Sequence, residues 1–180
     1  LSLGGSSTTT FSGAISGTGG ITLLSTYSGI QTLAGTSSYT GVTTINAGTL
    51  SVSTLANGGS NSNIGASTNS AANLVLGGGT LKYTGSDVTI DRGFTLTNST
   101  TGTIEVSTSS ATLTISGASA STSGALTKTG SGTLTLSGSN AYTGLTTISA
   151  GTLKNGAAGV ISDSSAVQIA NGATWDLADY

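Results

Sequence analysis

Few side chains in this sequence could take part in chemistry. Its 180 residues contain no His and no Cys, and the charged residues are 4 Lys or Arg and 6 Asp or Glu. The missing residue types exclude a thiol nucleophile, a Ser-His-Asp triad, a disulfide and metal ligation through imidazole or thiolate. The net charge of −2 excludes an electrostatic surface for nucleic acid or for anionic lipid.

The one concentration of charge consists of Asp87, Asp91, Arg92 and Glu105. Asp91 and Glu105 on successive coils could form a carboxylate pair for glycoside hydrolysis, or a calcium site. The structural alternative has Asp87 and Asp91 capping turns and Arg92 pairing with a nearby carboxylate. We favour this alternative, and expect no catalytic residue, no cofactor and no metal site.

Three Thr-x-Thr doublets, each around an apolar residue, offer a different chemistry, which is recognition by a regular array of hydroxyl and methyl groups. Stacked on one flat face they would resemble the surface of an ice-binding β-solenoid, although Thr is also simply a good residue for an exposed strand. The doublets are Thr95 and Thr97, Thr112 and Thr114, and Thr133 and Thr135.

The elements that would position these residues are short strands. Apolar residues recur two apart, as at Leu113 and Ile115 or Leu134 and Leu136, so that each pair faces one interior while its Ser or Thr neighbours face outwards. An antiparallel sandwich would need frequent hairpin turns, but Asn-Gly occurs only at residues 57–58, 155–156 and 171–172. The pattern therefore predicts an all-β fold with essentially no helix.

Internal repetition specifies the fold further. Residues 29–50 and 132–153 lie 103 positions apart and are identical at 14 of 22 positions. Within and between them a Gly-Thr-Leu phrase recurs at intervals typical of solenoid repeats. We predict a right-handed single-stranded parallel β-helix of about eight coils, in which each strand stacks about 4.8 Å above its counterpart in the preceding coil.

One stretch breaks this rhythm. Residues 55–72 are small and polar and too long for a tight corner, so we expect a loop that leaves the coil, with Ile64 folding back onto it. The rest of residues 1–180 is expected to be one β-helical segment excised from a longer chain.

Residues 126–153 closely resemble the autotransporter-associated β-strand repeat, also called the passenger-associated transport repeat. The matching motifs are the Lys-Thr-Gly opening at 128–130, the Tyr-Thr-Gly corner at 142–144 and the Ala-Gly-Thr-Leu close at 150–153. The first copy keeps the corner at 39–41 and the close at 47–50 but lacks the opening. The resemblance implies a right-handed β-helix in a type V secretion passenger or a giant bacterial surface protein.

The expected function is therefore that of a non-enzymatic β-helical shaft or spacer in a secreted bacterial adhesin or passenger. The alternative is an ice- or surface-binding Thr-rich solenoid, and a less favoured one is a polysaccharide-binding or polysaccharide-degrading β-helix. We expect an extracellular location, with outer-membrane attachment through regions outside this chain and no direct membrane contact from it. Expected partners are a host or neighbouring-cell surface, a glycan or an abiotic surface, and the segment could self-associate end to end.

Overall fold

Strands form where apolar residues alternate with threonine. In β12 (Thr112–Ile115) the side chains of Leu113 and Ile115 are buried, whereas Thr112 and Thr114 lie on the outside. The period of two is what a strand with one solvent face requires. The same alternation recurs in most other strands, so the sequence pattern directly defines an inside and an outside.

The computed structural model describes residues 1–179, which form 18 strands in three sheets, and every ladder between named strands is parallel. Sheet 1 contains β1 (Ser2–Gly5), β3 (Ile21–Tyr27), β5 (Thr43–Ile45), β7 (Leu74–Leu76) and β10 (Thr95–Leu96). Sheet 2 contains β2 (Thr9–Phe11), β4 (Ile30–Leu33), β6 (Thr49–Val52), β8 (Thr80–Tyr83), β11 (Thr101–Val106), β13 (Ala125–Thr129), β15 (Thr146–Ile148) and β17 (Val167–Ile169). Sheet 3 contains β9 (Val88–Ile90), β12, β14 (Thr133–Leu136), β16 (Thr152–Asn155) and β18 (Thr174–Asp176).

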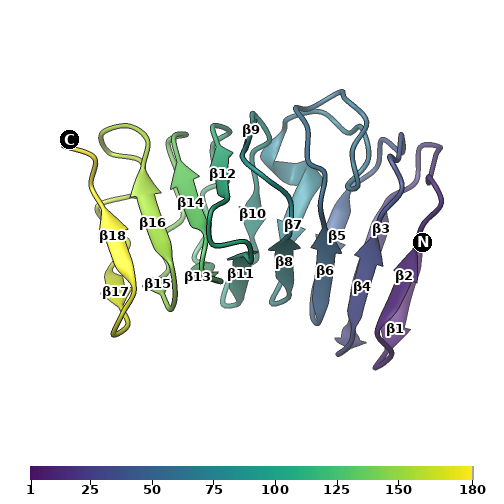
Figure 1. The fold of residues 1–180 in the computed structure, drawn as a ribbon, viewed down its shortest axis with the longest axis horizontal. Helices are drawn as coiled ribbons and strands as arrows, with labels where there is room; N and C mark the ends of the chain where they lie inside the picture. The colour runs from purple at the N-terminus through teal and green to yellow at the C-terminus, as the bar shows by residue number, and fades with distance from the viewer. Residues whose placement is uncertain (180) are drawn as a thin grey trace.

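The strands stack side by side along a rod, with the two termini at opposite ends (Figure 1). Sheet 2 has eight strands, one for each coil, and it runs the whole length of the rod. The predicted parallel β-solenoid of about eight coils is confirmed. Among the described residues the only helical element is one short 3₁₀ turn, η1 (Ala71–Asn73).

Of the other two sheets, one occupies the first half of the rod and the other occupies the second half. From β8 the chain passes through β9 in sheet 3 and β10 in sheet 1 before it returns to sheet 2 at β11. Before this coil, strands lie only in sheets 1 and 2, and after it only in sheets 2 and 3. The coil therefore has three faces, of which sheet 1 ends and sheet 3 begins near the middle of the chain.

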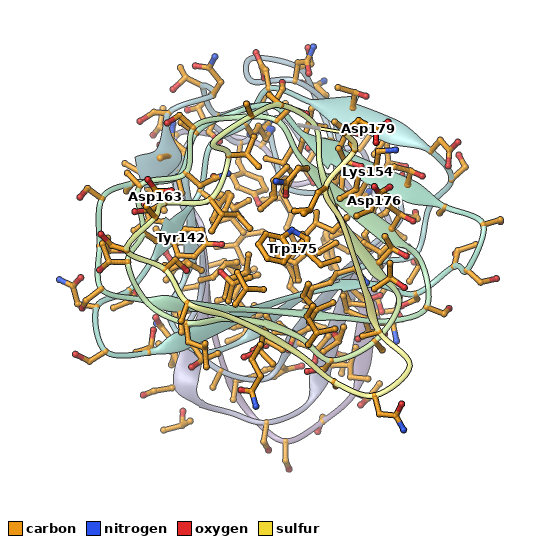
Figure 2. All side chains as sticks on the ribbon, turned by 90° about the vertical axis from the view of Figure 1, so that its left-hand side faces the viewer. Tyr142, Lys154, Asp163, Trp175, Asp176 and Asp179 are labelled. Carbon is orange, nitrogen blue, oxygen red and sulfur yellow. The ribbon has the colours of Figure 1, made fainter. Side chains whose placement is uncertain are left out.

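The interior is filled by aliphatic and aromatic side chains. Viewed from the C-terminal end, the chain forms a closed contour, with Trp175 pointing inwards and Lys154 and Asp176 lying on the outside (Figure 2). Among residues 1–179, twenty-nine hydrophobic residues are buried in one continuous cluster. Within the described residues we find no helix of the length and apolarity that a membrane crossing requires.

The segment between β6 and η1 is the largest departure from the coil. Residues 53–70 contain no named strand, yet Leu55 and Ile64 are buried and attach the segment to the core. An isolated antiparallel bridge joins Ser37 to Ser62, and the Ala66 N–H donates to the Tyr39 carbonyl. The segment thus folds back over the preceding coil, and we refer to residues 53–70 as the side loop.

Candidate functional site

Two of the three threonine doublets lie side by side. Thr112 pairs with Thr133, and Thr114 with Thr135, on the outer face of sheet 3. The register extends both rows into two outward columns. The first contains Thr112, Thr133, Thr152 and Thr174, and the second contains Thr89, Thr114, Thr135, Lys154 and Asp176.

The remaining doublet is elsewhere. Thr95 belongs to β10 and pairs with Val75 in sheet 1, while Thr97 follows that strand and is exposed. The six threonines therefore do not form one face. Moreover, Thr135 is only 8% exposed, and the ion pair between Lys154 and Asp176, at 3.2 Å, ends the second column.

The outer face of sheet 2 carries a longer threonine column that the doublet pattern missed. It spans five neighbouring coils and contains Thr49, Thr80, Thr103, Thr127 and Thr147. This column does not appear as Thr-x-Thr doublets in three of its coils, because the next outward position there is Ser51, Lys82 or Glu105. The sequence feature that identifies this column is a single Thr directly before each inward-facing residue.

Asp91 and Arg92 belong to the side loop's attachment. Asp91 accepts hydrogen bonds from the Gly58 N–H at 2.7 Å and from the Asn69 side chain at 3.3 Å. The prediction that Arg92 pairs with a carboxylate is wrong. Arg92 is 2% exposed, and its guanidinium donates to Ser67 Oγ and to the carbonyls of Ala56, Asn57, Ser60 and Gly65. The side loop supplies these oxygens because none of its backbone carbonyls there is part of a strand ladder.

Glu105 lies on a different face from Asp91. It forms an ion pair with Lys82 at 2.9 Å on the outside of sheet 2 and accepts a hydrogen bond from Ser107 at 2.7 Å. Partial burial opposes ionisation, but the bonds from Lys82 and Ser107 prevail and hold the pKa of Glu105 below its ordinary value. The carboxylate pair considered for glycoside hydrolysis is therefore not assembled.

Asp87 accepts a hydrogen bond from the Thr112 N–H of the next coil at 2.8 Å, so its carboxylate connects two corners. Among the described residues no three His, Cys, Asp or Glu side chains gather as metal ligands. Asp87, Asp91 and Glu105 thus all have backbone or side-chain partners within the protein.

The repeated tyrosines are buried in the rod. Tyr39 is 1% exposed and its hydroxyl contacts Thr43 Oγ1 at 2.7 Å, and Tyr142 makes the equivalent contact with Thr146 at 2.8 Å. Burial raises the pKa of both tyrosines to about 12. These residues pack at corners, as predicted, and offer no platform for stacking on a sugar.

Lys128, from the Lys-Thr-Gly opening, is completely buried. It stands between Ile104 and Ile148 in the interior column of sheet 2, and its ammonium donates to the carbonyls of Thr129, Gly130 and Ala150 at 2.7, 2.9 and 3.1 Å. Burial lowers its pKa to about 8. The three bonds join the corner after β13 to the corner before β16, one coil further on.

The comparisons with known proteins agree with this architecture. The passenger-associated-transport-repeat family matches residues 26–52 and 126–154, which contain β4 to β6 and most of β13 to β16. Over 131 residues, or 72% of this chain, the sequence is 51% identical to the adhesin BmaC autotransporter of Brucella suis biovar 1 (strain 1330). The chain spans 4% of the length of that relative.

No solved structure matches the chain. Three observations lead to the same assignment. They are the repeat motifs, the parallel coils that these motifs form and the similarity to an autotransporter. This chain belongs to the passenger-associated transport repeat family of autotransporter passengers.

Proposed function

We propose that this segment is a non-enzymatic structural shaft of a secreted bacterial surface protein, of the adhesin or autotransporter class. The observation that carries the proposal is the unbroken register of sheet 2 over eight coils around one continuous hydrophobic core. Each coil adds about 4.8 Å of length and buries its apolar side chains against the coils on either side. Such a rod holds whatever lies beyond it away from the cell.

The charged and polar groups support this role. Arg92, Lys128, Asp87 and Asp91 all bind oxygens or N–H groups of the chain itself, mostly of its backbone. Their chemistry is thereby used for holding corners and the side loop in place. The similarity to the adhesin autotransporter supports a location outside the cell, and attachment to the outer membrane through other regions of the protein is part of this proposal.

The test exchanges the segment within the complete protein that carries it. One form lacks residues 1–180, and a second form replaces them with an unrelated β-solenoid of the same number of coils. If the segment is a shaft, deletion reduces adherence of the bacteria to their target cells while the replacement preserves it. Loss of adherence in the replaced form, with the same amount of protein on the surface, would show that these residues bind a partner directly.

A second candidate function, recognition of ice or another regular surface, is favoured by the threonine columns of sheets 2 and 3. Thermal hysteresis of the purified segment would support it. Replacement of Thr103 and Thr127 on sheet 2, or of Thr114 and Thr135 on sheet 3, by lysine would then identify the active face. Equal freezing behaviour of the segment and an unrelated protein of similar size would rule this function out.

A further inference from the structure

The three Asn-Gly pairs of this chain sit in different surroundings. Asn-Gly sequences can lose ammonia when the glycine nitrogen attacks the asparagine side chain, because glycine leaves that nitrogen sterically open. The reaction needs the glycine N–H to be free of other partners. The three pairs therefore form a natural comparison within one molecule.

Two of the pairs are held by hydrogen bonds. In the side loop, the Gly58 N–H donates to Asp91 Oδ1 at 2.7 Å, and Asn57 Oδ1 accepts from the Asp91 N–H at 3.0 Å. At the end of β16, the Gly156 N–H donates to the Leu136 carbonyl at 2.7 Å. Asn155 is 9% exposed, and its Oδ1 accepts from the Trp175 indole at 3.0 Å. In both pairs the attacking nitrogen and the side-chain carbonyl are occupied.

The third pair is open. Asn171 and Gly172 are both exposed, at the tip of the turn between β17 and β18 that the Ala173 N–H closes by donating to the Ala170 carbonyl at 3.1 Å. Gly172 has φ of 81°, which suits the third position of a type II turn. Within the described residues neither the Gly172 N–H nor the Asn171 side chain has a recorded hydrogen bond, and no atom lies within 4 Å of the place a Cβ on Gly172 would take.

From this contrast we infer that Asn171 is a site of spontaneous modification in the folded protein. The Gly172 nitrogen gives its proton to solvent base and forms a bond to Asn171 Cγ. The bond from Cγ to Nδ2 then breaks, and Nδ2 takes a proton from solvent and leaves as ammonia. Water then opens the cyclic imide at either carbonyl. The products are aspartate and isoaspartate at position 171, and no oxidant or reductant is involved.

The modification changes a corner that is otherwise neutral. Each event adds one negative charge to a chain whose net charge is −2. The isoaspartate product also inserts a methylene group into the backbone between β17 and β18. This turn joins β17, an end strand of sheet 2, to β18, an end strand of sheet 3. The modified turn would therefore change the relative position of these two strands, on which a further coil would stack.

The experiment incubates the folded segment in mildly alkaline buffer prepared with heavy-oxygen water and follows each Asn-Gly peptide by mass spectrometry. We expect Asn171 to convert faster than Asn57 and Asn155 by about tenfold or more, the factor that about 1.4 kcal/mol of structural protection gives. The product should contain both aspartate and isoaspartate with one heavy oxygen. In denaturant the three rates should converge, because the hydrogen bonds that protect two of the pairs are then lost.

Two variants separate the mechanism from a general weakness of the turn. Gly172→Ala should slow the reaction, and Asn171→Gln, which keeps an amide without straining the turn, should nearly abolish it. Asn57 or Asn155 converting as fast as Asn171 in the folded protein would overturn the inference. An unmodified Asn171 under conditions in which the unfolded chain reacts, or a product that contains aspartate alone, would do the same.

Discussion

The two repeats, residues 29–50 and 132–153, have nearly the same local structure but occupy different faces of the rod. In the first repeat β4, β5 and β6 lie in sheets 2, 1 and 2, whereas the corresponding β14, β15 and β16 lie in sheets 3, 2 and 3. The second repeat is therefore advanced by one face. The local sequence determines where strands and corners form. The length of chain between the two repeats determines which face of the rod each repeat occupies.

Shared features show how closely the local structures agree. Gly48 and Gly151 both have φ of 65°, and each tyrosine of the Tyr-Thr-Gly corner bonds to the threonine four residues later. What differs is the polar group that fixes each repeat to its neighbours. The first repeat lies under the side loop, which is held by Arg92. The second repeat is preceded by Lys128, which donates to its Ala150 carbonyl, and the corresponding residue before the first repeat is the exposed Ser25.

The largest expected effect comes from the group that fixes the side loop. Replacing Arg92 by methionine removes five hydrogen bonds from a charged donor, two of them buried, to Ser67 Oγ and to the Gly65 carbonyl, which should destabilise the fold by about 3 kcal/mol or more. Limited proteolysis should then cut within residues 53–70. The control is Lys154→Met, which breaks a half-exposed ion pair and should cost less than about 1 kcal/mol. Unchanged protease resistance of the Arg92 variant would contradict the role assigned to this residue.

Alanine at the two matched glycines tests whether the corners are equivalent. Both substitutions force a side chain into the left-handed region, at a cost of about 1–2 kcal/mol. The new Cβ at Gly151 would also meet the carbonyls of Gly130 and Gly132, whereas at Gly48 its first contact is the Tyr27 ring. We therefore expect Gly151→Ala to cost about 1 kcal/mol more than Gly48→Ala in urea unfolding. The reverse order would show that the first corner is the more tightly packed.

The pH dependence of stability should carry a signature of Lys128, which has no charged counterpart before the first repeat. Because burial lowers the pKa of Lys128 to about 8, the folded state binds fewer protons than the unfolded state between pH 8 and the ordinary lysine pKa of 10.5. Stability should therefore rise with pH from about 8 towards 10, by roughly 2–3 kcal/mol at most. Above about pH 10 it should fall, because Tyr39 and Tyr142 keep their protons in the folded state up to about pH 12.

Urea midpoints measured across this pH range check the prediction. Lys128→Met should remove the rise and keep the fall, and it provides the matched control. A rise that persists in this variant would mean that another group titrates.

The smallest expected difference lies between the two tyrosines. Tyr39→Phe leaves Thr43 Oγ1 without the partner recorded for it, whereas after Tyr142→Phe the Thr146 hydroxyl still contacts Ser165 Oγ at 3.0 Å. We expect a cost of about 1 kcal/mol for Tyr39→Phe and roughly half of that for Tyr142→Phe, measured by thermal unfolding. Equal costs would show that the bond to Ser165 adds nothing.

Much of the fold could be predicted from the sequence, since apolar pairs such as Leu113 and Ile115 reveal which side of a strand is buried. The change of face between repeats could not, because it depends on how residues 53–125 divide between strands and corners. The burial of Lys128 was hidden for another reason. Its environment consists of backbone carbonyls, which no side-chain pattern reveals, and the same is true of the oxygens around Arg92.

In the part of the chain that the structure describes, sheet 2 alone connects every coil to the next through paired strands, since sheet 1 stops at β10 and sheet 3 starts at β9. The hydrogen bonds between parallel strands lie along the rod axis. When the two ends are pulled apart, the tensile force is therefore carried by sheets 1 and 2 in the N-terminal half and by sheets 2 and 3 in the C-terminal half, and all three sheets share it only around β8 to β11. Mechanical rupture should begin in the terminal coils, while the middle of the shaft keeps its shape under load.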